Sequence, residues 1–185
     1  MKTYFSILLI AVCISITVSV QAQNKIGIRA GYQSSTWHKD GSQLAGSDAN
    51  SSFYAGLFKE KKLIPLLHLG FGLEYLQNGA KLAGDNKQVI NYMGIPVYLK
   101  AKVGPFYALT GLGLNIKLSE KYFEGDNSVS VPEGSKTKGV DYPFILGAGF
   151  KILMFSIEAR YHWGLGDINN GITNQYLQVG AALSL

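Results

Sequence analysis

The sequence is poor in cysteine, proline and charge, with one cysteine, five prolines and 16% charged residues in 185 positions. The single cysteine, Cys13, excludes an internal disulfide framework. It follows Val12, where a lipoprotein signal has a smaller residue, so lipid attachment is not expected. The lysines and arginines are scattered, so the chain lacks the basic patch of a nucleic-acid-binding protein. Without disulfides, an exported domain of this size depends on packing or on lipid for its stability.

What the sequence has instead is glycine, aromatic side chains and one apolar N-terminal run. Twenty-two glycines and a 12% aromatic share favour strands over helices. Lys2 precedes an apolar run over residues 4–20, followed by small side chains suited to a signal peptidase, so we expect a signal peptide at residues 1–22. A membrane-anchoring helix is the alternative, but the run is barely long enough and contains several serines. Residues 23–185 are then expected to form one domain.

Apolar residues alternate with polar or small ones along most of this domain. The last nine residues, 177–185, place an apolar side chain at every odd position, which is the period of a strand with one apolar face. A strand at the end of the chain must pair on both edges or be shielded, and a closed barrel provides both partners. The predicted strands are residues 26–33, 53–60, 67–76, 93–100, 106–118, 144–152, 155–165 and 177–185.

The connections between these strands alternate in length. The long ones are expected at residues 34–52, 77–89 and 119–141, the short ones at 60–66, 102–105 and 153–154, and one of intermediate length at 166–174. Short turns on one side, longer loops on the other, an even strand count and strands of about ten residues are typical of outer-membrane barrels. A sandwich would not sort its links in this way. We therefore predict an all-β fold, an eight-stranded antiparallel up-and-down transmembrane barrel that follows a signal peptide.

The face opposite the apolar one decides between a membrane barrel and a soluble, lipocalin-like periplasmic carrier of a ligand. It carries many glycines and too many charges for dry burial against apolar side chains, so it is expected to line the lumen. Residues 53–60 are apolar on both faces, so alternation does not decide which face points outward; we prefer Phe53, Ala55 and Leu57 on the outer face. The residues expected to form ion pairs in the lumen are Arg29, Glu74, Lys100, Lys117, Glu158 and Arg160.

Eight strands leave an interior that side chains about fill, so ion pairs are expected to plug the lumen. The alternative is a narrow channel, a proton path, or a barrel associated with secretion or transport. In the long connections, Trp37, His38, Tyr122 and Phe123 are candidates for recognising a surface partner.

Several stretches together resemble the outer-membrane β-barrel domain family common in Bacteroidetes, which includes PorT-like proteins. These stretches are residues 53–58, 74–81, 92–100, 147–150 and 158–161. The most specific are Tyr-x-x-Ile-Pro at 92–96 and Glu-Ala-Arg-Tyr at 158–161. Gly94 stands where family members usually have Glu, and Leu185 where many end in Phe. The resemblance implies the fold and a location in outer-membrane lipid. The apolar C-terminal residue is expected to be recognised by the barrel-assembly machinery through the C-terminal strand, and a role in secretion belongs to one member of the family rather than to the family.

Catalytic chemistry has no clear signature. A lipase-like rim enzyme would need a Ser–His pair, but near His162 the only serine on the same strand, Ser156, lies about 20 Å away. His38, His68 and His162 lack the spacing of metal ligands. No enzyme activity, metal or cofactor is therefore expected. The predicted function is a structural or surface-interaction barrel, with an unidentified surface or secretion partner.

Overall fold

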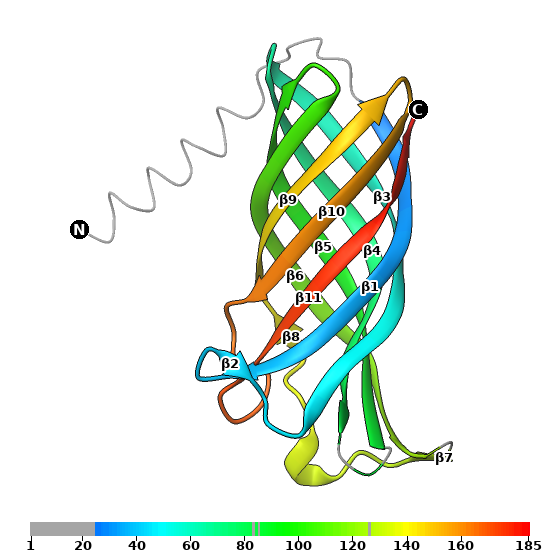
Figure 1. Cartoon of the computed structure of the whole chain (residues 1–185), viewed down its shortest axis with the longest axis vertical. Helices are drawn as coiled ribbons and strands as arrows, with labels where there is room; N and C mark the ends of the chain where they lie inside the picture. Colours follow the sequence, from blue (N-terminus) through cyan, green and yellow to red (C-terminus); the bar gives the residue numbers. More distant parts are fainter. Residues whose placement is uncertain (1–24, 83, 85, 126) are drawn as a thin grey trace, which may run out of the picture.

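The computed structural model of the chain describes residues 25–82, 84, 86–125 and 127–185. Eight long antiparallel strands form a closed barrel, because each pairs with the next and β11 also pairs with β1 (Figure 1). Their bounds are β1 (Lys25–Lys39), β3 (Ser47–Ile64), β4 (Leu67–Leu82), β5 (Asn86–Val103), β6 (Phe106–Glu124), β9 (Pro143–Ile152), β10 (Phe155–Gly164) and β11 (Ile172–Ser184). This is the predicted eight-stranded fold.

Short elements occupy the connections. They are β2 (Ser42–Gln43), β7 (Asn127–Val129), the 3-10 helix η1 (Glu133–Ser135) and β8 (Val140–Asp141). Within the described part of the chain, no helix is long and apolar enough to cross a membrane. The predicted signal peptide, residues 1–22, lies outside the described residues.

The two ends of the barrel differ. Strands β3 and β4, β5 and β6, and β9 and β10 are joined by two-residue turns at one end, called here the turn end, where β1 begins and β11 ends (Figure 1, top). Gly104 occupies one of these turns with φ +61°, a conformation that L-residues rarely adopt. All other connections lie at the opposite end, called here the loop end.

Six strands, β1, β3 to β6 and β11, extend several residues farther toward the loop end than predicted. Strands β1 and β3 to β6 contain 15 to 19 residues, whereas β9 and β10 contain ten, and about ten suffice to cross a membrane. The predicted connection at residues 77–89 is wrong over most of its length, because β4 continues to Leu82 and pairs with β5 without a gap from Glu74 to Leu82. Gly79 has φ +147°, and an added Cβ would lie 2.0 Å from the Gln88 carbonyl oxygen, so glycine permits the continuous pairing.

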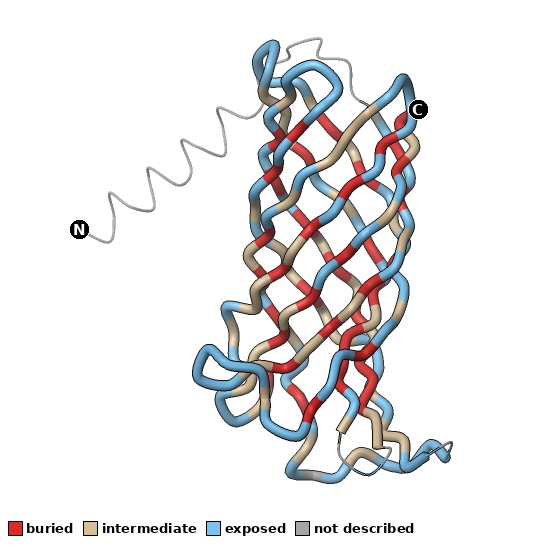
Figure 2. Tube along the Cα trace, in the orientation of Figure 1, coloured by how far each residue is buried: buried red, intermediate tan, exposed pale blue. Residues whose placement is uncertain are grey.

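The apolar face of the barrel points outward. Along each strand buried and exposed positions alternate (Figure 2), and large apolar side chains such as Leu57, Leu73 and Val97 are about half exposed. Tyr54 and Phe58 are buried in the interior while Phe53 is exposed, which confirms the preferred facing of residues 53–60. An inward apolar face, as in a lipocalin-like carrier, is therefore excluded.

Tyrosine hydroxyls mark the limit of this apolar band toward the loop end. Tyr32 hydrogen bonds with Ser51 at 2.7 Å, and the Tyr75 hydroxyl donates to Asn91 at 2.8 Å. The Tyr161 hydroxyl likewise donates to the Gln175 amide oxygen at 2.7 Å. Tyrosines with an apolar body and a bonded hydroxyl are typical of the boundary between lipid and water. The strand extensions lie beyond this girdle.

Candidate functional site

The charged residues of the lumen project from strands that face one another across the barrel. Arg29 is on β1, Glu74 on β4, and Glu158 and Arg160 on β10. None of the four is more than 3% exposed. Strand alternation places them inside, because each lies between two outward-facing apolar or small residues.

Neighbouring glycines make room for these long side chains. A Cβ added at Gly56 would lie 2.6 Å from Cγ of Glu74, and one at Gly147 would lie 2.9 Å from Cγ of Arg160. Side chains larger than hydrogen at these positions would collide with the charged groups. The glycines of the inner face thus create the space that the ion pairs fill.

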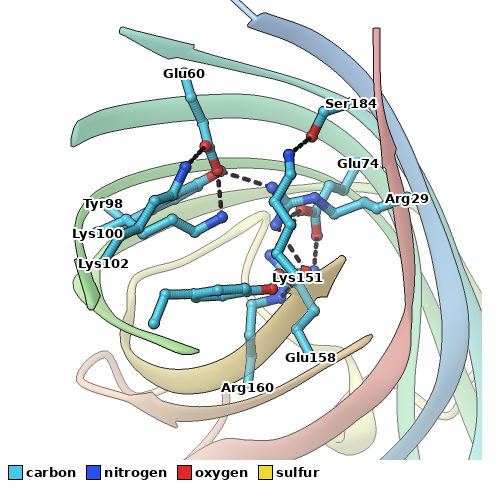
Figure 3. Close-up of polar contacts among 11 residues, drawn as sticks. Arg29, Glu60, Glu74, Tyr98, Lys100, Lys102, Lys151, Glu158, Arg160 and Ser184 are labelled. Carbon is cyan, nitrogen blue, oxygen red and sulfur yellow. Dashed lines mark hydrogen bonds and ion pairs between the residues drawn. The ribbon is translucent and has the colours of Figure 1, made fainter. Parts of the chain in front are cut away.

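These four residues form one network of ion pairs, called here the central network (Figure 3). Arg160 binds Glu74 in a bidentate manner, with Nη1–Oε1 at 2.8 Å and Nη2–Oε2 at 3.1 Å. Arg29 Nη1 lies 3.1 Å from Glu158 Oε1 and 3.6 Å from Glu74 Oε1. Arg160 Nε lies 3.5 Å from the same Glu158 oxygen. Two cations and two carboxylates are therefore balanced, as burial requires.

Aromatic side chains complete the central network. The Arg29 guanidinium donates to the Tyr98 hydroxyl at 2.6 Å and lies 4.2 Å from the centroid of the Phe58 ring. The Tyr107 hydroxyl donates to Glu158 Oε2 at 2.9 Å. These contacts supply hydrogen bonds and cation–π attraction to charged groups that are buried from solvent.

A second group of charges lies next to the central network, toward the turn end. Glu60 on β3 pairs with Lys100 and, at 3.0 Å, with Lys102, both on β5 (Figure 3). The Tyr98 hydroxyl lies 3.4 Å from Glu60 and so connects the two groups. Lys100 therefore pairs with Glu60 in the lumen, although Gly94 stands where family members usually have Glu. At position 94 the space is limited, because an added Cβ would lie 2.8 Å from the Leu76 side chain.

Lys117, the remaining predicted lumen cation, lies away from this network. It is near the loop end of β6, where it binds Glu120 Oε2 at 2.8 Å and the Thr137 carbonyl oxygen at 2.5 Å. Glu120 also accepts hydrogen bonds from the Thr137 backbone N–H and from Gln88. Lys117 thus ties a connecting segment to the barrel wall rather than joining the central network.

The predicted set of lumen residues does not include Glu60, Lys102, Tyr98 or Tyr107. The signal was present, because Tyr98, Lys100 and Lys102 occupy alternate positions of one strand. The predicted strand ended too early to include Lys102. Alternation places Tyr98 and Tyr107 on the inner face, but nothing in the local pattern shows that their hydroxyls contact buried carboxylates.

The four predicted recognition residues lie on strands and not in loops, which corrects the predicted placement. Trp37 and His38 belong to β1, while Tyr122 and Phe123 belong to β6 and pair with β7. Trp37 is 5% exposed and packs in an apolar cluster inside the loop end of the barrel. The other three are half-buried, and the Lys87 ammonium lies 5.1 Å from the centroid of the Phe123 ring.

His162 is also interior. It is 2% exposed and its ring stacks on Tyr176 with centroids 4.2 Å apart, so it does not reach the rim where a lipid ester would lie. Ser156 is buried on the same strand. Among the described residues, no group of three histidine, cysteine or acidic side chains could hold a metal ion.

An apolar cluster fills the barrel between the central network and the loop end. Its buried members are Trp37, Tyr54, Leu76, Ala80, Ile90, Tyr92, Ile168 and Tyr176. Ile168 belongs to the β10–β11 connection and is fully buried, so this connection folds into the mouth of the barrel. Between the cluster and Glu74 the interior holds a cavity of about 10 Å³, which is space for about one water molecule.

Asp141 is a buried acid without a cation partner in the described part of the chain. It lies in β8, within the connection between β6 and β9. One of its oxygens accepts a hydrogen bond from the Asn115 amide at 3.3 Å, and the other has no partner among the described residues. Burial raises the pKa of this carboxyl to about 6.

Comparisons with known proteins agree with this geometry. The sequence matches the family model described as outer membrane protein beta-barrel domain over residues 6–184. The fold is similar to Ail, the attachment invasion locus protein of Yersinia pestis, in its complex with the heparin analogue sucrose octasulfate. That match has 17% identity and a TM-score of 0.54, and it covers 88% of this chain and 99% of that one.

Neisserial surface protein A is similar as well, with 11% identity, a TM-score of 0.59, and coverage of 86% of this chain and 97% of that one. No curated protein sequence matches the chain. At such identities the structural matches show the fold alone, whereas the family model spans nearly the whole sequence. The chain belongs to the family of outer membrane proteins with a beta-barrel domain, and it is located in the outer membrane.

Proposed function

We propose that this protein is a non-catalytic outer-membrane barrel with a structural or surface-interaction role, and that ion pairs plug its lumen. The observation that carries the proposal is the central network, whose four charged residues join β1, β4 and β10 across the interior. The small cavity on the loop-end side of this network and the apolar cluster at the loop end support the same conclusion. No continuous aqueous path is expected through such an interior.

The surface-interaction role rests on the loop end. Short turns of an outer-membrane barrel face the periplasm, so the loop end faces outside. Five strands continue past the tyrosine girdle and form a hydrogen-bonded wall beyond it. A wall of paired strands is more rigid than flexible loops and suits the presentation of a binding surface.

The charge of the loop end limits the class of partner. Residues 34–52, 77–91, 117–141 and 164–176 together contain seven lysines and nine acidic residues. The similar protein Ail forms a complex with a heparin analogue, but a polyanion needs a positive surface. We therefore propose that this chain does not share polyanion binding with Ail.

Placement among the PorT-like barrels of Bacteroidetes is also proposed. It is supported by the Tyr-x-x-Ile-Pro sequence at residues 92–96 and by Glu-Ala-Arg-Tyr at 158–161, which contributes two members of the central network. Assembly through the C-terminal strand is consistent with β11, which closes the barrel against β1 over thirteen residue pairs. A secretion-associated channel is the second candidate function, because the lumen is charged.

Conductance of the purified barrel in planar bilayers tests the plug. The wild type is expected to show no steady current, and Glu74→Ala combined with Arg160→Ala is expected to increase brief openings. A steady open state in the wild type would refute the plug and favour the channel. Surface binding is measured separately, by loss of cell attachment when the gene is deleted and its return on complementation.

A further inference from the structure

A cavity at the loop end is not used by the central network. It has a volume of about 200 Å³ and lies between the end of β1, the segment 133–138 and the β10–β11 connection. This volume is below that of sites for drug-sized ligands, so it fits a smaller molecule. In an outer-membrane barrel this end faces outside, and the cavity is accessible from there.

Hydrogen bonds hold the walls of this cavity together. Gln88 donates to the Ser135 carbonyl oxygen at 2.8 Å, and Asn169 donates to the Gly134 carbonyl oxygen at 3.1 Å. The Lys138 backbone N–H donates to the Ile168 carbonyl oxygen at 2.7 Å. The cavity therefore exists before any ligand binds, which lowers the entropic cost of binding.

The lining combines apolar and neutral polar groups. Trp37, Leu82 and Ile168 supply apolar surface, while Gln88, Asn169 and Thr137 supply amide and hydroxyl groups. Gln88 Nε2 already donates to Glu120 and Ser135, and Asn169 Nδ2 donates to Gly134, so the amide oxygens are the groups offered to the hydroxyls of a ligand. None of the described residues that line the cavity is charged. Neutral donors and acceptors beside apolar surface match a molecule that has hydroxyl groups on its edge and carbon–hydrogen bonds on its face.

Trp37, one of the lining residues, has a polar atom without a partner among the described residues. Trp37 is 95% buried, since its exposed fraction is 5%, and its indole N–H forms no hydrogen bond within the described part of the chain. A buried donor without an acceptor is unfavourable. A ligand in the cavity that provides one acceptor would remove this cost and gain affinity from it.

We propose that this cavity binds a single neutral sugar residue, in the pyranose form. An apolar ring face beside Trp37 and Ile168, and hydroxyls beside the amides, satisfy both parts of the lining. The sugar is either a free monosaccharide or the terminal residue of a surface polysaccharide, which share this chemistry. The proposal deepens the surface-interaction role and rests on it for the outward orientation of the cavity.

The two tryptophans of the chain provide the measurement. Trp37 lines the cavity, whereas Trp163 lies on β10 and packs on Phe144, with ring centroids 5.9 Å apart. In a ¹⁵N NMR spectrum of the full barrel in detergent micelles, each indole N–H gives one signal. Trp163→Phe assigns the signals and serves as a matched control that leaves the cavity intact.

Methyl β-D-glucopyranoside and N-acetylglucosamine are the neutral probes, and glucosamine and glucuronate are charged controls of similar size. A neutral probe is expected to shift the Trp37 signal saturably with a Kd on the order of 1 mM, and the charged controls to bind roughly tenfold more weakly. The Trp163 signal is expected to stay in place. By calorimetry, Trp37→Phe and Asn169→Leu are each expected to abolish binding.

A trisaccharide with the same terminal residue distinguishes the two sources. Equal affinity for it indicates a polysaccharide end, and its exclusion indicates a free monosaccharide. The proposal is overturned if neither neutral probe moves the Trp37 signal at roughly 100 mM, or if charged controls bind as well as neutral ones. Neither result affects the attachment and conductance measurements, so the two proposals fail separately.

Discussion

Removal of Glu74 is the most informative perturbation of the lumen. In the wild type, Glu74 accepts two hydrogen bonds from Arg160 and lies 3.6 Å from Arg29. In Glu74→Ala, both guanidinium groups must share Glu158, whose one oxygen lies 3.1 Å from Arg29 Nη1 and 3.5 Å from Arg160 Nε. The centre of the barrel then carries one uncompensated positive charge.

The expected loss of unfolding free energy is about 3–5 kcal/mol, because breaking a buried pair leaves a charge that has lost both water and partner. The matched control is Asp167→Ala. Asp167 pairs with Lys138 at 3.1 Å on the surface, with the two side chains 40% and 61% exposed. Exposed pairs contribute at most about 1 kcal/mol, so this variant is expected to be nearly as stable as the wild type.

A double variant separates charge from packing. In Glu74→Leu with Arg160→Met, both charges are replaced by apolar side chains, which for buried pairs is often neutral. It is expected to regain most of the stability that either single change loses. The assay is guanidinium unfolding in detergent micelles, followed by tryptophan fluorescence. A loss below about 1 kcal/mol in Glu74→Ala, or additive effects in the double variant, would contradict the coupling inferred from the structure.

Three further changes have defined outcomes. Burial raises the pKa of the Asp141 carboxyl from 3.8 to about 6, so between pH 4 and 6 this carboxyl loses its proton more readily in the unfolded chain than in the folded one, and stability falls as the pH rises. Asp141→Asn should abolish this fall and gain up to about 3 kcal/mol at pH 7; an unchanged pH dependence of the unfolding midpoint would contradict this. Gly149→Ala places a Cβ 2.3 Å from the Tyr107 ring and should cost about 1–3 kcal/mol in the same unfolding assay, so wild-type stability would show that the ring moves freely. Tyr75→Phe removes the hydrogen bond to Asn91 and should cost about 0.5–1.5 kcal/mol in lipid vesicles; no loss there would argue against a role for the girdle.

Much of the fold could be predicted because strand periodicity is a local property. Alternation over 67–76 or 177–185 fixes which side chains share a face, and the charges on the other face require an interior that can pair them. The extent of β1, β4 and β6 could not be predicted in this way. Beyond the girdle the outward face of these strands is mainly polar, and the inner face mixes polar side chains with apolar ones such as Trp37, Leu76 and Ala80. The outward apolar period that marks a membrane-spanning strand is therefore lost, although backbone pairing continues.

The sequence by itself determined the eight spanning strands, their apolar outer face, and the inward position of Arg29, Glu74, Glu158 and Arg160. Only the tertiary structure decided that Glu60 binds Lys100 and Lys102, that Lys117 stands apart, and that Trp37 is buried. The reason is physical. Alternation assigns a face within one strand, but the height of each side chain in the barrel depends on the stagger of eight paired strands, and partners in the lumen must meet at the same height.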